Sequence, residues 1–410
     1  MKIKLLPTLL HGEITVPPSK SVAHRFIIAA SLAEGRSVIS NLQASADILA
    51  TIECMRALGT KIDFDGERAV IDGIETPAES AELNCCESGS TLRFLVPVAC
   101  ALGTSARFYG KGKLPHRPLT PLLDELPKHG ITFDYNGTMP FGVSGKLKGG
   151  KFFIGGDISS QFITGLLFAL PLLNDDSEIV LTSHLQSKPY VDITLGALSE
   201  FGIEIKETKN GYFVKGSQHY KPSDTSVEGD YSQAAFFETA NALGSNVNIN
   251  GLNVNSFQGD KKIVEIIEKI VYNKNGELNP FELDCSDIPD LVPILAVLGS
   301  FCNGTSYITN AQRLRIKECD RLAAISECLN KIGGDVRQTE DGLVINGKKQ
   351  LVGGEVDSFN DHRIAMAMAI AATRCVKPLV INGAEAVRKS YPDFWEDYRS
   401  LGSDVQTLEN

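Results

Sequence analysis

The feature that most constrains the fold is an apolar stretch of helical length that occurs six times along the chain. Each stretch is hydrophobic on nearly every face, as residues 364–370 illustrate. A helix that is apolar all round is buried inside a domain. The pattern therefore predicts six buried helices, at residues 21–34, 90–102, 159–173, 231–243, 290–302 and 362–375.

A short strand and an amphipathic helix follow each apolar stretch. The strands are predicted at 37–39, 106–108, 178–180, 246–249, 306–308 and 378–381. The amphipathic helices are predicted at 48–58, 119–129, 191–201, 262–271, 321–332 and 394–401. In the first five copies a further strand or strand pair is expected. The recurring order favours an α/β fold of six similar units; a solenoid is the alternative, although the units lack its fixed short period.

Length and composition narrow the possible functions. The 410 residues include 50 acidic and 40 basic side chains, a formal charge of -10, which argues against a general nucleic-acid binder. No uncharged apolar run approaches the roughly 18 residues of a membrane-spanning helix. The nine cysteines have neither disulfide nor zinc spacing, so we expect reduced thiols in the cytoplasm and no metal site.

Polar residues gather at the start of the buried helices. Examples are Lys20-Ser21 with Arg25, Ser159-Ser160-Gln161 and Asp361-His362-Arg363. Helix N-termini have unpaired N–H groups and attract anions. Ordinary capping by Ser and Asp is the alternative, but capping does not require the neighbouring cations. We interpret His24, within the first of these groups, as an ordinary polar residue at a helix start.

A second set of cations precedes the amphipathic helices, at residues 116–117, 187–190, 313–321 and 388–391. Lys317 and Arg321 are four residues apart and share a helix face, with Glu318 beside it. A solvated basic stretch is the alternative for any one of these segments. Together the two sets predict a cationic pocket for a strongly anionic small molecule, since Arg and Lys both suit phosphate and carboxylate groups.

The motifs Lys20-Ser21, Ser159-Ser160-Gln161, Lys317-Glu318-x-x-Arg321 and Asp361-His362-Arg363 resemble those of the 5-enolpyruvylshikimate-3-phosphate (EPSP) synthase family. The resemblance extends over essentially the whole chain. It implies a two-domain inside-out α/β barrel of six βαβαββ repeats, three per domain. The domains would be residues 17–227, on the shikimate 3-phosphate side, and 1–16 with 228–410, carrying residues for phosphoenolpyruvate. They would close over the substrates.

The resemblance also implies a reaction. The enolpyruvyl group of phosphoenolpyruvate would pass to the 5-hydroxyl of shikimate 3-phosphate, releasing phosphate through a tetrahedral intermediate, in aromatic amino acid biosynthesis. No electron is transferred, so acid–base groups and positive charge suffice and no cofactor or metal is expected. The implied partners are these two small molecules, without nucleic acid or membrane, and the implied state is a cytoplasmic monomer. Members of the family are glyphosate targets, but Phe94 replaces a proline, which leaves that response open.

Site residues are carried over position by position. Those implied for shikimate 3-phosphate are Lys20, Ser21, Arg25, Ser159, Ser160, Gln161, Ser187, Tyr190, Asp290, Arg313 and Lys317. Those implied for phosphoenolpyruvate are Lys20, Gly89, Arg117, Gln161, Arg321, Arg363 and Lys389. Asp290 is the expected base for the 5-hydroxyl, Glu318 is expected to transfer the proton at C3, and Lys20, His362 or Lys389 would assist the leaving phosphate.

Two departures from the family pattern qualify this assignment. Residues 87–90 read Glu-Ser-Gly-Ser where many members have Asn-Ala-Gly-Thr, and Arg313 stands where some members have Asn. Two other functions stay open. A UDP-N-acetylglucosamine enolpyruvyl transferase usually has a cysteine in the loop matching 110–117, which here contains none. A non-catalytic anion-binding protein would gain nothing from carboxylates beside anionic ligands, because like charges repel.

Overall fold

The computed structural model describes residues 1–270 and 277–408. The chain forms two compact units. One, here the central unit, is Pro18–Glu228; the other, the terminal unit, combines Met1–Pro17 with Gly229–Asn410. The domain boundaries expected from the sequence lie one residue earlier at each junction. Each unit has its own hydrophobic core, so each can position side chains independently of the other.

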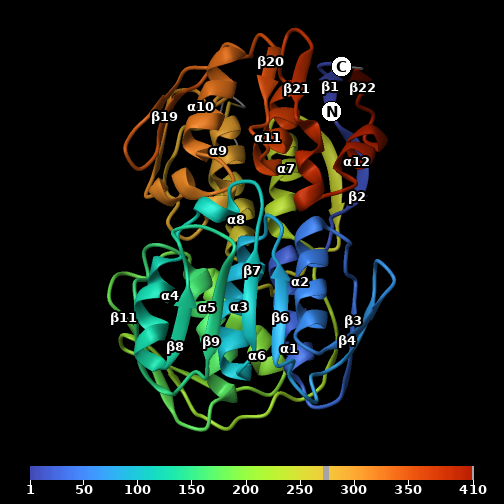
Figure 1. The fold of residues 1–410 in the computed structure, drawn as a ribbon. Coiled ribbons are helices and arrows are strands. Elements are labelled where there is room, and N and C mark those ends of the chain that lie inside the picture. The colour runs from blue at the N-terminus through green and yellow to red at the C-terminus, as the bar shows by residue number, and fades with distance from the viewer. Residues whose placement is uncertain (271–276, 409–410) are drawn as a thin grey trace. The chain divides into compact units, whose positions relative to one another are not determined.

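Three buried helices form the interior of the central unit (Figure 1). They are α1 (Lys20–Leu32), α3 (Gly89–Leu102) and α5 (Ser160–Ala169), as the apolar stretches predict. The second helix of each repeat is α2 (Ala46–Ala57), α4 (Thr120–Glu125) or α6 (Lys188–Glu200). The helix predicted at 119–129 is shorter, since the chain tightens into the 3₁₀ turn η2 (Leu126–His129), whose Pro127 has no N–H to continue an α-helix.

The terminal unit repeats this plan. Its buried helices are α7 (Tyr231–Ala242), α9 (Val292–Gly299), which follows the 3₁₀ turn η5 (Pro289–Leu291), and α11 (His362–Ala372). Its second helices are α8 (Lys262–Ile270), α10 (Arg321–Lys331) and α12 (Phe394–Ser400). Residues 364–372 of α11 are completely buried, which confirms the prediction from their composition. Residue 271, the predicted last residue of α8, lies outside the described residues.

The four-stranded sheets share one pattern of strand pairing. Five sheets have four strands, and in each the first two neighbours run parallel. In three of them the strands lie in the chain order first, second, fourth, third; in the other two, β14 and β1 are supplied by a distant part of the chain. The strands of the central unit form the sheets β14-β3-β5-β4, β6-β7-β9-β8 and β10-β11-β13-β12. Their bounds are β3 (Arg36–Ser40), β4 (Lys61–Phe64), β5 (Ala69–Asp72), β6 (Ser80–Asn84), β7 (Ser105–Tyr109), β8 (Ile131–Asp134), β9 (Phe141–Gly145), β10 (Gly150–Ile154), β11 (Ser177–Leu181), β12 (Ile205–Thr208), β13 (Gly211–Val214) and β14 (Asp224–Ser226). In four of the five sheets the buried helix α3, α5, α9 or α11 is the crossover that two parallel neighbours require, whereas β14 and β3 are not consecutive in the chain.

The terminal unit departs from the expected repeat at its two ends. Its sheets are β15-β2, β16-β17-β19-β18 and β20-β21-β1-β22. Their bounds are β1 (Lys2–Leu5), β2 (His11–Thr15), β15 (Asn246–Asn250), β16 (Glu282–Asp284), β17 (Thr305–Thr309), β18 (Val336–Gln338), β19 (Leu343–Asn346), β20 (Gly354–Asp357), β21 (Leu379–Asn382) and β22 (Val405–Leu408). In the fourth repeat the described residues after α8 contain one strand, β16, which pairs with β17 of the next repeat; residues 271–276 of this segment lie outside the described residues. The N-terminal segment compensates: β2 pairs with β15, and β1 completes the last sheet.

One glycine sets how closely two buried helices of the central unit approach. A Cβ on Gly165 of α5 would lie 2.3 Å from the carbonyl oxygen of Arg93 in α3. Only a residue without a side chain allows such an approach. This contact fixes the N-terminal turns of α3 and α5 beside each other, where several of the predicted site residues lie.

Candidate functional site

The predicted site residues lie at or just before helix N-termini, and the structure gathers them into one group in each unit. In the central unit the helices α1, α3, α5 and α6 and the 3₁₀ turn η1 (Leu114–His116) supply them. In the terminal unit they come from α10 and α11, from the 3₁₀ turns η5, η6 (Gln312–Ile316) and η7 (Ala384–Lys389), and from the residues just after η6. The two groups are described separately below.

In the central unit, Lys20 opens α1 and forms an ion pair with Asp47 in the first turn of α2. The Nζ–Oδ2 distance is 2.9 Å, and both side chains are largely shielded from solvent. Ion pairs between groups of this kind hold a lysine in one place more effectively than a solvent-exposed pair does. Lys20 is therefore a fixed cation at the start of a buried helix.

Arg25 lies one turn further along α1 and is 2% exposed. Its guanidinium donates to the carbonyl oxygens of Ser21 and Tyr190, at 2.6 and 2.8 Å, and to Oγ1 of Thr194 at 2.8 Å. It also packs over the ring of Phe94, 5.1 Å from the centroid. Burial lowers the pKa of Arg25 to about 9, which still leaves a cation at neutral pH.

Gly89, the first residue of α3, has two guanidinium groups against it. A Cβ at this position would lie 2.9 Å from Nη1 of Arg117 and 2.9 Å from Nη1 of Arg93. Arg93 donates to Oε1 of Gln161 at 2.8 Å, and Gln161 in turn donates to Oγ of Ser90 at 2.9 Å. The amide of Gln161 thus joins the first turns of α3 and α5, and two cations are placed at a glycine-opened helix N-terminus.

The remaining predicted residues of this unit lie at the starts of α5 and α6. Ser159 caps α5 by accepting from the backbone N–H of Gln161 at 3.3 Å, and Ser160 is buried beside it. Ser187 precedes α6 with φ 58°, a left-handed conformation that non-glycine residues seldom adopt. Tyr190 follows one turn later and contacts Arg25 through its carbonyl oxygen. Hydroxyl groups therefore accompany the cations, as anion binding requires.

In the terminal unit, Arg321 opens α10 and is surrounded by carboxylates. It is 2% exposed and donates to Asp290 at 2.9 Å, to Glu318 at 2.8 Å and to Asp361 at 2.7 Å. Asp361 is fully buried and caps α11 by accepting from the backbone N–H of Arg363 at 2.9 Å. Removing one partner of such a buried pair typically costs about 3–5 kcal/mol.

Asp290 joins Arg321 to Arg363. Its Oδ2 accepts from Nη2 of Arg363 at 2.7 Å, and Arg363 also reaches Oγ of Ser232, in the first turn of α7, at 3.1 Å. Burial alone would raise the pKa of Asp290, but Arg363, Arg321 and Lys317 outweigh it and hold that pKa well below its usual range. Asp290 is thus an ionised carboxylate with a weak affinity for protons as long as both arginines face it.

Three further predicted residues lie around this network. Lys389, the last residue of η7, donates to the carbonyl oxygen of Asn360 at 2.7 Å. His362 is buried, with Nδ1 3.9 Å from Oδ1 of Asp361. The guanidinium of Arg313 donates to the carbonyl oxygen of Ser286 at 2.7 Å, so it belongs to the loop before η5 rather than to the carboxylate network.

Sequence analysis missed three residues that these groups depend on. Arg93 is a buried cation inside an apolar helix, and that composition alone was a signal. Asp361 stands within a motif that was identified, but nothing in the sequence gave it a role. Asp47 has no signal, because its pairing with Lys20 depends on how α1 and α2 pack.

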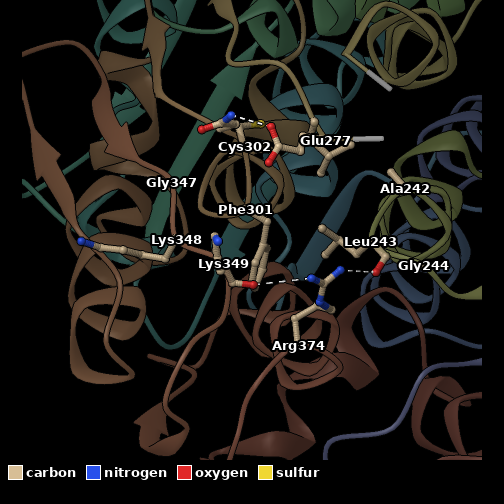
Figure 2. A pocket seen from close by; sticks show the side chains of 12 residues that line it. Ala242, Leu243, Gly244, Glu277, Phe301, Cys302, Gly347, Lys348, Lys349 and Arg374 are labelled. Carbon is tan, nitrogen blue, oxygen red and sulfur yellow. Dashed lines mark hydrogen bonds between the residues drawn. The ribbon is translucent and has the colours of Figure 1, made fainter. Parts of the chain in front are cut away.

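The cavity in Figure 2 lies away from these residues. Its volume is about 460 Å³, and it is found where α7, α9 and α11 end, whereas the predicted residues lie where the helices begin. At this end Arg374 donates to the carbonyl oxygens of Leu243, at 2.7 Å, and Lys349, at 3.5 Å (Figure 2). Arg374 thus satisfies the carbonyl group of Leu243, which α7 leaves unpaired at its C-terminal end, and this is a structural role.

Residues 1–270 and 277–408 contain no group of three or more His, Cys, Asp or Glu side chains arranged to hold a metal ion. Over the same residues, none of the helices has the length and apolar character needed to cross a bilayer.

Comparison with known proteins gives a consistent result. Residues 6–398 match the sequence model of "EPSP synthase (3-phosphoshikimate 1-carboxyvinyltransferase)". The chain is 47% identical over 416 residues to a 3-phosphoshikimate 1-carboxyvinyltransferase of Clostridium perfringens, covering 98% of both chains, and 47% identical over 422 residues to that of Clostridium novyi, covering 98% and 97%. A solved EPSP synthase structure from Acinetobacter baumannii matches with a TM-score of 0.82 at 26% identity, covering 99% of this chain and 100% of that one. This chain belongs to the EPSP synthase family.

Proposed function

We propose that this chain has 3-phosphoshikimate 1-carboxyvinyltransferase activity: it transfers the enolpyruvyl group of phosphoenolpyruvate to the 5-hydroxyl of shikimate 3-phosphate and releases phosphate. Membership of the family is the observation that carries this proposal. The two groups of cations at helix N-termini support it, because each substrate has two anionic groups, a carboxylate and a phosphate.

The charges of the substrates account for the number of cations. Each substrate has a carboxylate and a phosphate of about -1.5 to -2, so the pair carries roughly five to six negative charges. In the central unit Lys20, Arg25 and Arg117 supply positive charge, together with the helix N-termini. In the terminal unit Arg321, Arg363 and Lys389 supply the rest. We propose that cations of both groups contact the two substrates.

The assignment of residues follows their position. Shikimate 3-phosphate would take its contacts mainly from the central unit, with Ser159, Ser160 and Arg25 at its charged groups and Gln161 along the ring. Phosphoenolpyruvate would use the glycine-opened start of α3 at Gly89 with Arg117, and the arginines of the terminal unit. Lys20, Ser21, Ser187, Tyr190, Arg313 and Lys317 are further proposed contacts of shikimate 3-phosphate, and Lys20, Gln161 and Lys389 of phosphoenolpyruvate. Asp290 would meet the 5-hydroxyl as a base and contribute little to affinity.

In the protein without substrates the lowered pKa of Asp290 makes this carboxylate a weak base, so acting as a base requires that the effect of the neighbouring arginines be reduced. With Arg321 and Arg363 both facing it, its pKa lies well below the usual range. Substrate anions that pair with these arginines weaken that effect, and the pKa of Asp290 rises toward a value suited to accepting a proton. We propose that Asp290 takes the proton of the 5-hydroxyl only once the anions are bound.

The second proton transfer is at C3 of the enolpyruvyl group. Glu318 is the proposed residue, because it contacts Arg321 at 2.8 Å and so lies beside the same proposed phosphoenolpyruvate contact as Asp290. Protonation of C3 accompanies attack of the hydroxyl on C2, and loss of a proton from C3 accompanies departure of phosphate. Lys20, His362 or Lys389 would stabilise the charge on that phosphate.

We further propose a monomer that works in the cytoplasm. The nine cysteines are all free thiols, which suits a reducing compartment. Size-exclusion chromatography with light scattering would give the mass of one chain, 44.4 kDa, if the protein is a monomer. A concentration-independent mass of twice that value would contradict this part of the proposal.

The activity is tested by measuring phosphate release from phosphoenolpyruvate in the presence of shikimate 3-phosphate, with mass spectrometry of the product. The expected result is one phosphate released for each enolpyruvyl ether formed. UDP-N-acetylglucosamine serves as the competing acceptor in a parallel reaction. Turnover with the nucleotide sugar alone, or tight binding of both substrates without phosphate release, would contradict the proposal.

A further inference from the structure

Four buried side chains form a continuous hydrogen-bonded chain across three helices of the central unit. His24 of α1 contacts Thr51 of α2, Thr51 contacts Thr91 of α3, and Thr91 contacts Ser88, the residue that caps α3. Each of the three contacts is 2.7 Å long. All four residues are at most 1% exposed. Together they are called the hydroxyl relay below.

The hydrogen atoms of the relay run in one direction. Thr91 donates its hydroxyl proton to Oγ of Ser88, so the proton in the contact between Thr51 and Thr91 must come from Thr51. Because Thr51 donates its hydroxyl proton to Thr91, its Oγ1 accepts from Nδ1 of His24. The carbonyl oxygen of Asp47 is the alternative acceptor for the Thr51 proton, but at 3.3 Å it is more distant than Thr91. The relay therefore requires a proton on Nδ1.

The surroundings of His24 agree with this tautomer. Burial, followed by the charges of Lys20 and Arg25, holds the pKa of His24 well below its usual value, so the ring is neutral. Its Nε2 is buried and has no hydrogen-bond partner in the part of the chain that the structure describes. A buried N–H without an acceptor is costly and rare, so the proton belongs on Nδ1 and Nε2 keeps its lone pair.

One end of the relay, Ser88, directly precedes the candidate site residue Gly89. Ser88 accepts from the backbone N–H of Thr91 at 3.2 Å as well as from its hydroxyl, and so fixes the first turn of α3. The next residue is Gly89, against which the guanidinium groups of Arg93 and Arg117 pack.

At its other end the relay lies one helical turn from an ion pair of the candidate site. His24 follows Lys20 by one turn of α1, and Thr51 follows Asp47 by one turn of α2, where Lys20 and Asp47 pair. The relay thus connects the first turn of α1, which contains Lys20, to the first turn of α3, which contains Gly89.

We propose that His24, Thr51, Thr91 and Ser88 are positioning residues that hold the N-terminal turn of α3 in register with Lys20, so that both meet the anionic groups of phosphoenolpyruvate. None of the four is exposed enough to touch a ligand itself. The inference rests on the proposed function and deepens it, since it assigns phosphoenolpyruvate affinity to residues below the site. A space-filling role alone would make no use of the hydroxyl groups.

The hydroxyl of Thr51 can be removed with little change in side-chain volume, because valine has nearly the same shape as threonine. Thr51→Val keeps the shape of the side chain but breaks two contacts of the relay, whereas Thr51→Ser keeps the hydroxyl and loses a methyl group. We expect Thr51→Val to raise KM for phosphoenolpyruvate about tenfold, because small displacements of a binding group cost affinity steeply, while kcat changes less than about threefold. Thr51→Ser should restore KM to within about twofold of the wild type.

A matched control separates the relay from general core damage. Thr239 of α7 is also fully buried, but its hydroxyl has no hydrogen-bond partner among the described residues. Thr239→Val should leave both KM values unchanged. An unchanged KM in Thr51→Val, or an equal rise in Thr51→Ser, would overturn the proposal. So would a fall in kcat that follows the loss of thermal stability while KM stays constant.

The tautomer of His24 provides a test in the wild-type protein. Nitrogen-15 spectra of histidine-labelled full-length chain, with the His24→Asn variant for assignment, should show His24 neutral and protonated on Nδ1 at neutral pH. A proton on Nε2 would make Thr51 the donor to Nδ1 of His24, which would contradict the proposed direction of the relay. Wild-type protein that does not turn over the two substrates contradicts the proposed function itself, whereas active wild type with an unaffected Thr51→Val contradicts the relay alone.

Discussion

The two groups of site residues differ in what holds their arginines. In the central unit the hydrogen bonds of Arg25 all go to neutral oxygen atoms, of Ser21, Tyr190 and Thr194. In the terminal unit Arg321 is held by three carboxylates, of Asp290, Glu318 and Asp361. Both arginines are 2% exposed, so the difference lies in the partners and not in burial. Arg25 keeps its full positive charge for a ligand, while the charge of Arg321 is already compensated.

This difference suggests a division of tasks. Neutral acceptors orient a cation without reducing its attraction for an anion, which suits binding. Carboxylates around a cation reduce that attraction but supply groups that can take and give protons when an anion competes for the cation. We therefore expect substitution of Arg25 to change affinity, and substitution of the carboxylates Asp290 and Glu318 to change the rate of reaction.

The largest expected effect is on turnover. Asp290→Asn keeps the size of the side chain but removes the proposed base, and kcat at saturating concentrations of both substrates should fall about 10²–10⁴-fold. Phosphate release measures it. A loss confined to KM, with kcat near the wild-type value, would place Asp290 in binding and remove the contrast between the two groups.

A smaller effect should appear in affinity. Arg25→Lys keeps the charge but cannot serve three neutral acceptors in different directions, so KM for shikimate 3-phosphate should rise about 10–100-fold, with a smaller change in kcat. Steady-state kinetics at saturating phosphoenolpyruvate measures both constants. If kcat fell and KM stayed constant, Arg25 would act in the reaction rather than in binding.

The packing that aligns the central group can be tested by stability. Gly165→Ala places a methyl group against the carbonyl oxygen of Arg93, where the distance would be 2.3 Å. The helices must separate, and the free energy of unfolding should fall by about 1–3 kcal/mol. Denaturant unfolding measures the change. Unaltered stability would mean that α5 moves freely, and that Gln161 is not held beside Arg93 by this contact.

The smallest expected effect is on the pH dependence of the free energy of unfolding. His24 has a pKa well below the usual value in the folded protein, so below about pH 6.5 the unfolded chain binds a proton that the folded chain does not. The stabilising effect is complete above that pH and is lost as the pH falls, by about 1.4 kcal/mol per pH unit. Unfolding at pH 6.5 and 5.5 should show a steeper loss in the wild type than in His24→Asn. Equal slopes would show that His24 titrates normally.

The sequence predicts the helices well because their patterns are local. Each apolar stretch, such as that around Met366 in α11, can only be buried, and that follows from composition alone. The strand order within a sheet, and the use of β1 and β2 to complete sheets of the terminal unit, depend on segments distant in sequence and leave no local pattern.

The candidate site shows the same limit. Motifs identify the residues that we propose as ligand contacts, including Arg321 and Arg363, since cations beside helix caps are unusual. Residues that act through others are harder to find: Asp361 compensates Arg321 from another helix, and His24, interpreted as a polar residue at a helix start, is almost completely buried. Their roles arise from packing between helices, which the sequence of one helix does not specify.

The most direct test of the proposed division is the affinity of the Asp290→Asn protein for shikimate 3-phosphate, measured by isothermal titration calorimetry. If the central group binds this substrate and the terminal group carries out proton transfer, the Kd should stay within about threefold of the wild type although turnover is lost. A Kd that weakens by as large a factor as kcat falls would show that Asp290 serves binding, and would contradict the division between the two units.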